Sequence, residues 1–306
     1  MKLDRRKFVK VSSLAIPGLM IFPSACVSKQ GGEAAAVDSA AVASDIVAPV
    51  NKMNLQNFGI QLYTLRDDMP KDPKGVLEKL SGFGYNQIEG YEGDMGLWWG
   101  MGHKEFKSYL DGLGLNFISS HCNPMENFEQ KVAEAAEVGA KYLIAPWVGP
   151  QKSIEDFKRI ADQFNKLGEV CRAGGLRFAY HNHDYSFVEV DGLLPQDVMI
   201  EGTDPELVDF EMDMYWVVTG GHDPVEWMKK YPGRFKLCHV KDRTKGVSAE
   251  DRESTCVLGE GSINYPAILS DSKSYGMEYF IVEQEKYEGT TPIASAEANA
   301  KYMKAL

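Results

Sequence analysis

The sequence predicts a single (β/α)8 TIM barrel of the α/β class, and three observations support this fold. From Asn57 onward, short apolar runs alternate with longer amphipathic stretches, a pattern typical of parallel strands joined by helices. Eight such units occupy about 250 residues, the usual size of a closed barrel. The chain contains neither a GxGxxG nor a P-loop sequence. An open, doubly wound nucleotide-binding sheet is therefore the weaker alternative.

The predicted elements follow one another through the last 250 residues of the chain, with glycine and proline at the joints. The apolar runs predict strands at Phe58–Tyr63, Asn86–Glu89, Asn116–His121, Tyr142–Trp147, Arg177–Asn182, Leu207–Asp213, Phe235–Val240 and Tyr279–Glu283. Helices are predicted between most of them, for example at Lys74–Gly82, Lys104–Gly112, Phe128–Val138, Ile154–Ala173 and Pro224–Lys230. We expect one catalytic domain over residues 54–306 and no second domain.

The composition of the 306-residue chain excludes several classes of protein. It is 44% hydrophobic, which is enough for a sizeable core, and its formal net charge is -11. Because no basic stripe is present, nucleic acid is not an expected partner. The five cysteines lack CxxC spacing, which argues against a zinc ribbon or a redox pair. Cys122 and Cys238 are expected to be small buried core residues.

The N-terminus has the pattern of an export signal over residues 1–26. A basic start precedes an apolar stretch, Val11–Phe22, that is too short to span a bilayer as a stable helix. The segment Arg5-Arg6-Lys7-Phe8 resembles the twin-arginine export motif, which would direct the protein to the periplasm. Ser24-Ala25-Cys26 resembles the end of a lipoprotein processing site. Lipid attachment at Cys26 and simple cleavage nearby both remain open, and residues 27–53 read as a flexible tether.

Polar residues that could perform chemistry cluster where the predicted strands end. In a barrel of this kind the catalytic groups lie at the C-terminal ends of the strands. Four of the six histidines fall there: His121, His181, His183 and His239. A lone histidine is more often structural. Four that converge on one rim point instead to metal binding or acid–base catalysis.

Strand alternation narrows the choice of metal ligands. Residues two apart in a strand point the same way, so His181 shares a face with His183, and Glu211 shares one with Asp213. Taking one ligand from each of the last four strands gives the set His181, Asp213, His239 and Glu283. A mixed shell of imidazole and carboxylate suits one divalent ion, with Mn²⁺, Co²⁺, Mg²⁺ and Zn²⁺ all open.

Five motifs, in this order, are similar to those of the xylose-isomerase-like barrel superfamily. This superfamily includes sugar phosphate isomerases/epimerases and inosose dehydratases. The motifs are YHNHDYSF at 180–187, FEMDMYWVVTGGHDP at 210–224, CHVKDR at 238–243, LGEGSINYP at 258–266 and IVEQE at 281–285. The resemblance covers residues 57–306 and implies one divalent metal. It implies ligands at Asp213, His239 and Glu283, but the chain has His181 where many relatives have a glutamate.

The resemblance also implies a reaction. A proton leaves the carbon next to a carbonyl, and the metal stabilises the resulting enediolate charge. In epimerases of this group, glutamates of the fifth and eighth strands act as paired acid–base groups. With His181 in the ligand set, Glu283 needs another partner. The candidates for it are His183, Lys241, His121 and Glu89.

The remaining candidate residues would bind a carbohydrate substrate, which is the expected small-molecule partner. Arg243 and Lys241 can neutralise substrate oxyanions. Gln61 begins the segment Gln61–Arg66, in which the first predicted strand ends. Tyr63, Trp147 and Trp216 can either wall the pocket and stack on a sugar ring or fill the core.

Three functions stay open from the sequence. An exported metal-dependent sugar isomerase or epimerase is the leading hypothesis. A lyase or dehydratase acting on a 3-keto-sugar or keto-glycoside is the alternative enzyme. The alternative from another class is a non-catalytic carbohydrate-binding protein. Export would favour a free sugar or glycoside over a sugar phosphate. The oligomeric state is not specified, and a homo-oligomer is compatible with the sequence.

Overall fold

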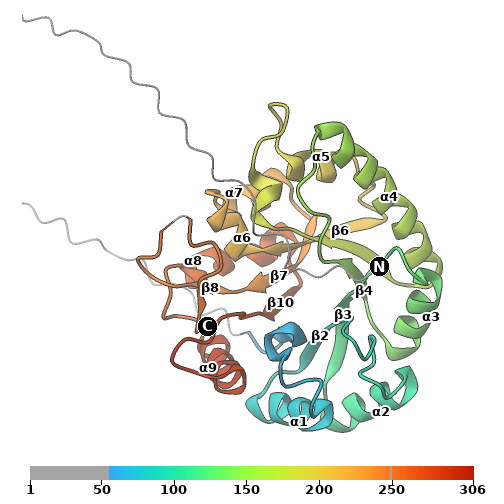
Figure 1. Cartoon of the computed structure of the whole chain (residues 1–306), viewed down its shortest axis with the longest axis vertical. Coiled ribbons are helices and arrows are strands. Elements are labelled where there is room, and N and C mark those ends of the chain that lie inside the picture. Colours follow the sequence, from blue (N-terminus) through green and yellow to red (C-terminus); the bar gives the residue numbers. More distant parts are fainter. Residues whose placement is uncertain (1–54, 249) are drawn as a thin grey trace, which may run out of the picture. The chain divides into compact units, whose positions relative to one another are not determined.

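Eight parallel strands close into a barrel, which confirms the predicted fold class (Figure 1). The structure is a computed structural model, and it describes residues 55–248 and 250–306. Around the barrel the strand order is β1-β10-β7-β6-β5-β4-β3-β2. The strands are β1 (Gly59–Gln61), β2 (Gln87–Tyr91), β3 (Asn116–His121), β4 (Tyr142–Ala145), β5 (Arg177–His181), β6 (Val208–Asp213), β7 (Phe235–Val240) and β10 (Tyr279–Val282).

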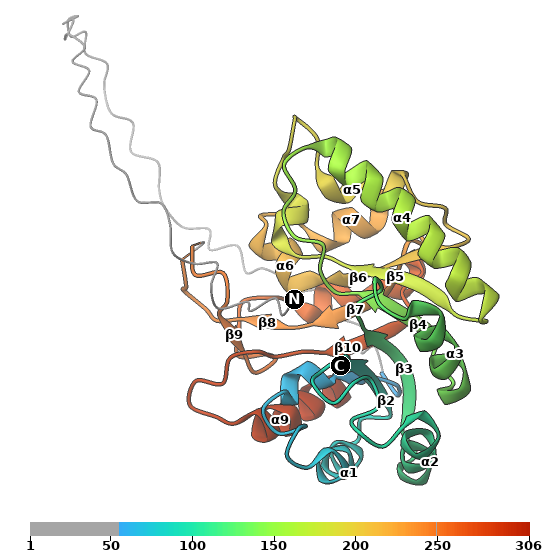
Figure 2. The same ribbon diagram turned by 45° about the vertical axis from the view of Figure 1, so that its right-hand side comes forward.

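Helices surround the strands and cover their outer, apolar face, as both views of the ribbon show (Figure 2). The helices are α1 (Pro73–Phe83), α2 (His103–Leu113), α3 (Phe128–Val138), α4 (Ile154–Ala173), α5 (Pro195–Glu201), α6 (Met214–Thr219), α7 (Pro224–Lys230), α8 (Tyr265–Ser270) and α9 (Pro292–Ala305). Short 3-10 helices are η2 (Leu62–Leu65), η3 (Asp184–Phe187) and η4 (Ser272–Tyr275). A two-stranded antiparallel ribbon, β8 (Asp242–Arg243) and β9 (Thr255–Cys256), follows β7.

The barrel closes between its first and last strands, and the ring of helices closes with it. β1 pairs with β10 through Gly59 opposite Ile281. Outside this joint α9 packs beside α1. The Lys304 ammonium donates to the carbonyl of Phe83 at 2.6 Å, and the Tyr85 hydroxyl donates to the carbonyl of Ala296 at 2.9 Å. These contacts hold the first and the last strand of the barrel, β1 and β10, side by side.

Local sequence signals place the helix ends. Asp72, Ser153 and Thr291 each accept a backbone N–H in the first turn of α1, α4 and α9. At Ser153 the bond is reciprocated by Asp156, which makes a capping box. Helix α1 ends at Gly84, whose φ of 96° requires a residue without a Cβ.

Most element boundaries agree with the sequence predictions, and the exceptions have physical causes. Helices α3, α4 and α7 and strands β3 and β7 begin and end where the sequence predicts. Strand β4 stops at Ala145 because Pro146 has no N–H to continue the ladder. Strand β1 stops at Gln61, where the chain turns into η2. The ribbon of β8 and β9 was not predicted, since two-residue strands leave no sequence period.

The N-terminal predictions concern residues that the structure does not describe. The export signal over residues 1–26 and the tether over residues 27–53 both lie outside the described residues. Within residues 55–248 and 250–306, no helix has the length and apolar character needed to cross a bilayer. Cys122 and Cys238 are buried in the barrel, as expected.

Candidate metal centre and active site

Four side chains from consecutive strands converge at the C-terminal end of the barrel, and they are the predicted ligand set. His181 ends β5, Asp213 ends β6, His239 lies in β7 and Glu283 directly follows β10. Asp213 lies directly opposite His239, whereas His181 lies opposite Glu211 and His239 opposite Ile281, so the other neighbouring ligands are two residues apart in register and on the same face. All four are at least 95% buried. We call this set the upper ring.

The ligand atoms of the upper ring surround a space of the size of a metal ion. Nδ1 of His239 lies 3.2 Å from Nε2 of His181, 3.2 Å from the Glu283 carboxylate and 3.6 Å from Oδ2 of Asp213. Nε2 of His181 lies 3.4 Å from the same Oδ2. Bonds of about 2.1 Å to a tetrahedral ion would place neighbouring ligand atoms roughly 3.4 Å apart. These separations fit a bound cation better than short hydrogen bonds.

Buried polar atoms without a partner also gather here. Within the described residues, no hydrogen bond reaches Oδ2 of Asp213, Nδ1 of His181, Nδ1 of His183 or Nε1 of Trp216. Buried polar groups in folded proteins nearly always have a partner, so unpaired atoms at one place call for a bound group. The donor set of the upper ring, two imidazoles and two carboxylates, matches a divalent ion.

The charges around the upper ring are unusually dense. Burial alone would raise the pKa of Asp213 and Glu283, but the nearby Lys241 ammonium and the histidines hold both well below their usual range. Burial would lower the pKa of His239, yet Glu211 and Glu283 raise it well above its usual value. The ring therefore holds anionic carboxylates around a cationic centre. A divalent ion can take the place of the His239 proton at that centre.

Lys241 closes one side of the upper ring. Its ammonium lies 3.1 Å from the Glu283 carboxylate, 3.7 Å from that of Asp213 and in contact with Glu285. The same ammonium lies 5.1 Å from the ring centroid of Trp216. These carboxylates raise the pKa of Lys241 well above its usual value, although burial alone would lower it. Lys241 is therefore a protonated acid beside the ligand set.

His183 lies beside His181 in a frame of aromatic side chains. Its imidazole is 4.9 Å from that of His181, and it packs edge-on against Trp147 at 4.5 Å and tilted against Trp216 at 5.4 Å. Burial and the neighbouring His181 hold the pKa of His183 well below its usual value. The side chain is therefore a neutral imidazole. Trp147, which is 49% exposed, forms the outer wall of this frame.

A second set of buried side chains lies beside the upper ring, and it shares His239 with it. These residues are Glu89 of β2, His121 at the end of β3, Glu211 of β6 and His239. We call this set the lower ring. His121 and His239 outweigh the effect of burial and lower the pKa of Glu89 to about 2. Burial and the Glu89 charge raise the pKa of Glu211 well above its usual value. One carboxylate of the pair is thus ionised and the other protonated.

The structure places other predicted site residues away from the upper ring. Gln61 is fully buried and donates to Glu89 at 2.8 Å, so it supports the lower ring. Tyr63 packs edge-on against Tyr91. The Arg243 guanidinium donates to the carbonyls of Ser248 and Asp251, and it holds the loop between β8 and β9.

Two acidic residues near the site were not named as candidates from the sequence. Glu211 belongs to the lower ring, and Glu285 pairs with Lys241. The signal was the alternation that places Glu211 on the face of Asp213 and Glu285 on the face of Glu283. A residue spacing alone cannot tell which member of such a pair faces the ion, because that depends on the register with the neighbouring strands.

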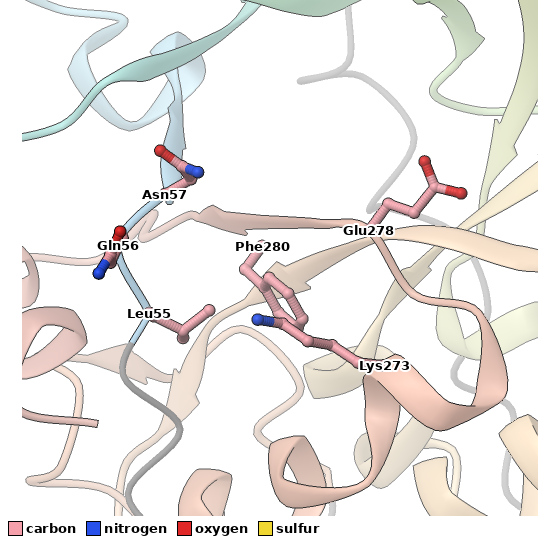
Figure 3. A pocket seen from close by; sticks show the side chains of 6 residues that line it. All are labelled: Leu55, Gln56, Asn57, Lys273, Glu278 and Phe280. Atoms are coloured by element: carbon pink, nitrogen blue, oxygen red, sulfur yellow. The ribbon is translucent and has the colours of Figure 1, made fainter.

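One hollow of about 260 Å3 lies at the other end of the barrel (Figure 3). It is lined by residues at the starts of β1 and β10 and by one lysine of η4: Leu55, Gln56, Asn57, Lys273, Glu278 and Phe280. Figure 3 shows the Lys273 side chain lying in front of the Phe280 ring. The N-terminal end of such barrels contributes stability rather than catalysis. We therefore place the active site at the upper ring.

The chain is similar to several known proteins. It is 31% identical over 166 residues to an inosose dehydratase of Clostridium perfringens, covering 49% of this chain and 54% of that protein. The match thus spans about half the length of that curated relative. An inosose dehydratase of Geobacillus kaustophilus is 25% identical over 78% of this chain and 86% of its own length.

Solved structures share the fold over most of the described chain. A sugar phosphate isomerase/epimerase from Parabacteroides distasonis superposes with a TM-score of 0.72 at 31% identity, covering 80% of this chain and 96% of that one. The IOLI protein, solved with a zinc atom, superposes with a TM-score of 0.64 at 17% identity, over 80% of this chain and 95% of that one. At 17% identity the likeness to IOLI shows the fold alone.

The family model described as "Xylose isomerase-like TIM barrel" matches residues 77–306. This range contains every strand of the barrel except β1, and all members of the upper ring. The motifs, the closed barrel and this match agree, and the chain belongs to the xylose isomerase-like TIM barrel family.

Proposed function

We propose that this protein is a metal-dependent lyase that acts on a keto-sugar or keto-glycoside by removing a proton next to the carbonyl. The observation that supports this most strongly is the upper ring, with its ion-sized spacing and the unpaired Oδ2 of Asp213. The names of the relatives, inosose dehydratase and sugar phosphate isomerase/epimerase, support a carbohydrate substrate.

The upper ring would hold one divalent ion through His181, Asp213, His239 and Glu283. Such an ion supplies a Lewis acid that stabilises negative charge on a substrate oxygen. The zinc atom of the IOLI neighbour is compatible with this proposal. The identity of the ion stays open among Mn²⁺, Co²⁺, Mg²⁺ and Zn²⁺, since all accept imidazole and carboxylate ligands.

Two side chains next to the upper ring, one a neutral imidazole and the other a protonated ammonium, support an elimination. We assign the role of base to His183, a neutral imidazole whose Nδ1 has no partner within the described residues. We assign the role of acid to Lys241, a buried ammonium on the side of Glu283. His183 would take the proton next to the carbonyl, and Lys241 would donate a proton to the leaving oxygen. Trp147, which is 49% exposed and packs against His183, would form the wall on which the sugar ring stacks.

A second candidate function is that of an isomerase or epimerase. The Parabacteroides structure favours it by its name. The two-glutamate mechanism implied by the resemblance does not fit here, because His181 takes the place of one glutamate and Lys241 binds the other, Glu283. An epimerase would therefore have to use His183 and Lys241 on opposite faces of the substrate. We regard the lyase as better supported.

The products of the reaction distinguish these functions. The metal-loaded protein would be incubated in deuterated water with a panel of 3-keto-sugars and keto-glycosides, and the products followed by NMR. The lyase predicts an unsaturated product and release of the β-substituent. A deuterated isomer or epimer without elimination would instead support the second candidate. Binding without turnover or deuterium exchange would support a non-catalytic carbohydrate-binding protein.

We also propose that residues 1–26 export the protein to the periplasm. The support comes from the sequence alone, through the twin-arginine-like segment and the short apolar stretch. Fractionation of cells that express the full chain tests this proposal. Replacing Arg5 and Arg6 by lysine should retain the protein in the cytoplasm. A Cys26→Ser variant that leaves the membrane fraction would indicate a lipid anchor, and unchanged release would indicate simple cleavage.

A further inference from the structure

The lower ring differs from the upper ring in the spacing of its atoms. Nε2 of His239 lies 2.7 Å from Oε1 of Glu89, and Nε2 of His121 lies 2.7 Å from Oε2 of Glu211. The diagonal contacts, His121 to Glu89 and His239 to Glu211, are longer at 3.4 Å. Both contacts of 2.7 Å have the length of hydrogen bonds, and the one to the ionised Glu89 is charge-assisted. The upper ring has no contact shorter than 3.2 Å among its four ligand atoms.

His239 connects the two rings through its two ring nitrogens. Nδ1 faces His181, Asp213 and Glu283, whereas Nε2 faces Glu89. When a divalent ion takes the place of one His239 proton, the imidazole is neutral and has one N–H, and an ionised carboxylate such as Glu89 can only accept it. Glu89 therefore places the N–H at Nε2 and leaves the Nδ1 lone pair directed into the upper ring.

Glu89 is itself held in place by two donors. The Ser119 hydroxyl donates to Oε2 at 2.6 Å, and the Gln61 amide donates to Oε1 at 2.8 Å. All three side chains are fully buried. The Gln61 amide is fixed in turn, because its carbonyl oxygen accepts the N–H of Tyr63. The carboxylate of Glu89 cannot turn away from His239 without breaking these bonds.

From this arrangement we infer that Glu89 is a positioning residue for the metal ligand His239, an inference that rests on the proposed ion in the upper ring. A carboxylate behind a metal-bound histidine fixes the tautomer and ring orientation and makes the imidazole a stronger ligand. Glu89 is 0% exposed, and its hydrogen bonds go to Gln61, Ser119 and His239. The residue acts through His239 and is not a base.

Glu211 provides a matched comparison within the same ring. It is also a fully buried glutamate, but its short bond goes to His121 and its distance to His239 is 3.4 Å. Replacing either glutamate by glutamine keeps the size of the side chain in the lower ring, but only Glu89→Gln removes an ionised carboxylate. Only Glu89 makes the short bond to a member of the upper ring.

The test measures metal affinity by competition with a chelator, using Co²⁺ as the probe and the full chain. For Glu89→Gln we expect Co²⁺ to bind tenfold to a hundredfold more weakly. We also expect its visible absorption spectrum to change, because the geometry of the His239 ligand is no longer fixed. For Glu211→Gln we expect less than a threefold change and an unaltered spectrum. Far-UV circular dichroism checks that both variants fold.

A second variant keeps the test informative if Glu89→Gln does not fold. Ser119→Ala leaves the carboxylate but removes the donor to its Oε2, and it should weaken Co²⁺ binding severalfold in the same direction. Equal affinities of wild type, Glu89→Gln and Ser119→Ala would overturn the positioning role alone. So would two Co²⁺ ions in wild type and one in each glutamate variant, since the lower ring would then hold an ion itself. If wild type bound no Co²⁺, the proposed function would fail as well.

Discussion

At the scale of single residues, the site is marked by buried polar atoms that have no hydrogen-bond partner. His181, His183, Asp213 and Trp216 each contain a buried polar atom without a partner in the described residues. Asp242 of β8 shows the opposite state, since its carboxylate accepts the N–H groups of several residues. The carboxylate of Asp213 thus differs from that of Asp242, because its Oδ2 is left open for a ligand.

Replacement of the proposed base should remove turnover and leave the ion in place. His183→Asn should lower kcat by roughly 10²–10⁴-fold, the usual contribution of a general base. Its metal content should equal that of wild type, because His183 is not in the upper ring. The rate of solvent deuterium exchange into a 3-keto-sugar measures the effect.

His222→Asn serves as the control for this substitution. His222 is also partly buried and packed against aromatic rings, but it contacts the carbonyl of Phe187 and lies outside both rings. We expect the exchange rate to be unchanged. An equal loss of exchange in both variants, or a loss of the metal in His183→Asn, would remove His183 from the assigned role.

At the scale of elements, side chains at strand ends could be predicted from the sequence, whereas contacts that depend on strand register or on loops could not. The ligands were predictable because each ends an apolar run, and a parallel barrel gathers strand ends at one face. The role of Gln61 was not predictable, because its contact with Glu89 depends on the register between β1 and β2. The contacts of Arg243 were likewise not predictable, because its guanidinium donates to carbonyls of a loop that has no periodic sequence pattern.

The motif LGEGSINYP illustrates an element whose role becomes clear only in the structure. The backbone N–H groups of Gly259, Gly261 and Ile263 donate to the Asp242 carboxylate at 2.9–3.1 Å. This anchor holds the chain that follows β7, directly beside Lys241. The motif therefore positions the proposed acid through the backbone and supplies no catalytic side chain.

The glycine at the centre of this anchor should not tolerate a side chain. A Cβ at Gly261 would overlap the Asp242 carboxylate and the Arg243 carbonyl. Gly261→Ala should lower the free energy of unfolding by about 1–3 kcal/mol, as overpacking does. It should also reduce turnover, because Asp242 and the neighbouring Lys241 must shift. Urea denaturation followed by circular dichroism measures the change in stability.

Gly112→Ala is the matched control for Gly261→Ala. Gly112 lies within α2, and a Cβ there meets nothing within 4 Å. Alanine is a better helix former than glycine, so the variant should be more stable by up to about 1 kcal/mol. If Gly261→Ala were as stable as this control, the Asp242 anchor would not have the role described.

At the scale of the whole molecule, the barrel buries many groups that must stay protonated. Burial raises the pKa of the Cys122 thiol to about 12, and it raises that of Cys238 further. Tyr85, which bonds to α9, and Tyr142, which packs among residues of neighbouring strands, have a raised pKa for the same reason. The unfolded chain releases these protons near pH 9–10, whereas the folded chain retains them.

Stability should therefore fall as the pH rises above 9. A folded-state pKa above the unfolded value stabilises the fold at low pH, and this contribution is lost between the two values. For Cys122 the interval runs from its ordinary value of 9 to about 12. We expect the urea midpoint at pH 10.5 to lie below that at pH 8. A midpoint that stays constant or rises would show that these groups ionise in the folded state.

The overall architecture was predictable from the sequence, but the different roles of the upper and lower rings were not. Alternating apolar runs specify a barrel with the histidines at one end, as the closed sheet confirms. The distinction between an ion-sized upper ring and a hydrogen-bonded lower ring depends on separations of a few tenths of an ångström. Such differences are set by strand register and packing, and no residue pattern encodes them directly.

The metal content of the purified full-length protein tests the central claim most directly. Inductively coupled plasma mass spectrometry would compare wild type with Asp213→Asn and with Asp209→Asn. Asparagine at 213 can still accept the Trp216 N–H that caps α6, but it is a weaker ligand. Asp209 is a buried aspartate of the same strand that binds Arg177 outside the upper ring.

We predict one divalent ion per chain in wild type and in Asp209→Asn and none in Asp213→Asn. Wild type without a stoichiometric ion, or Asp213→Asn with a full one, would contradict the account.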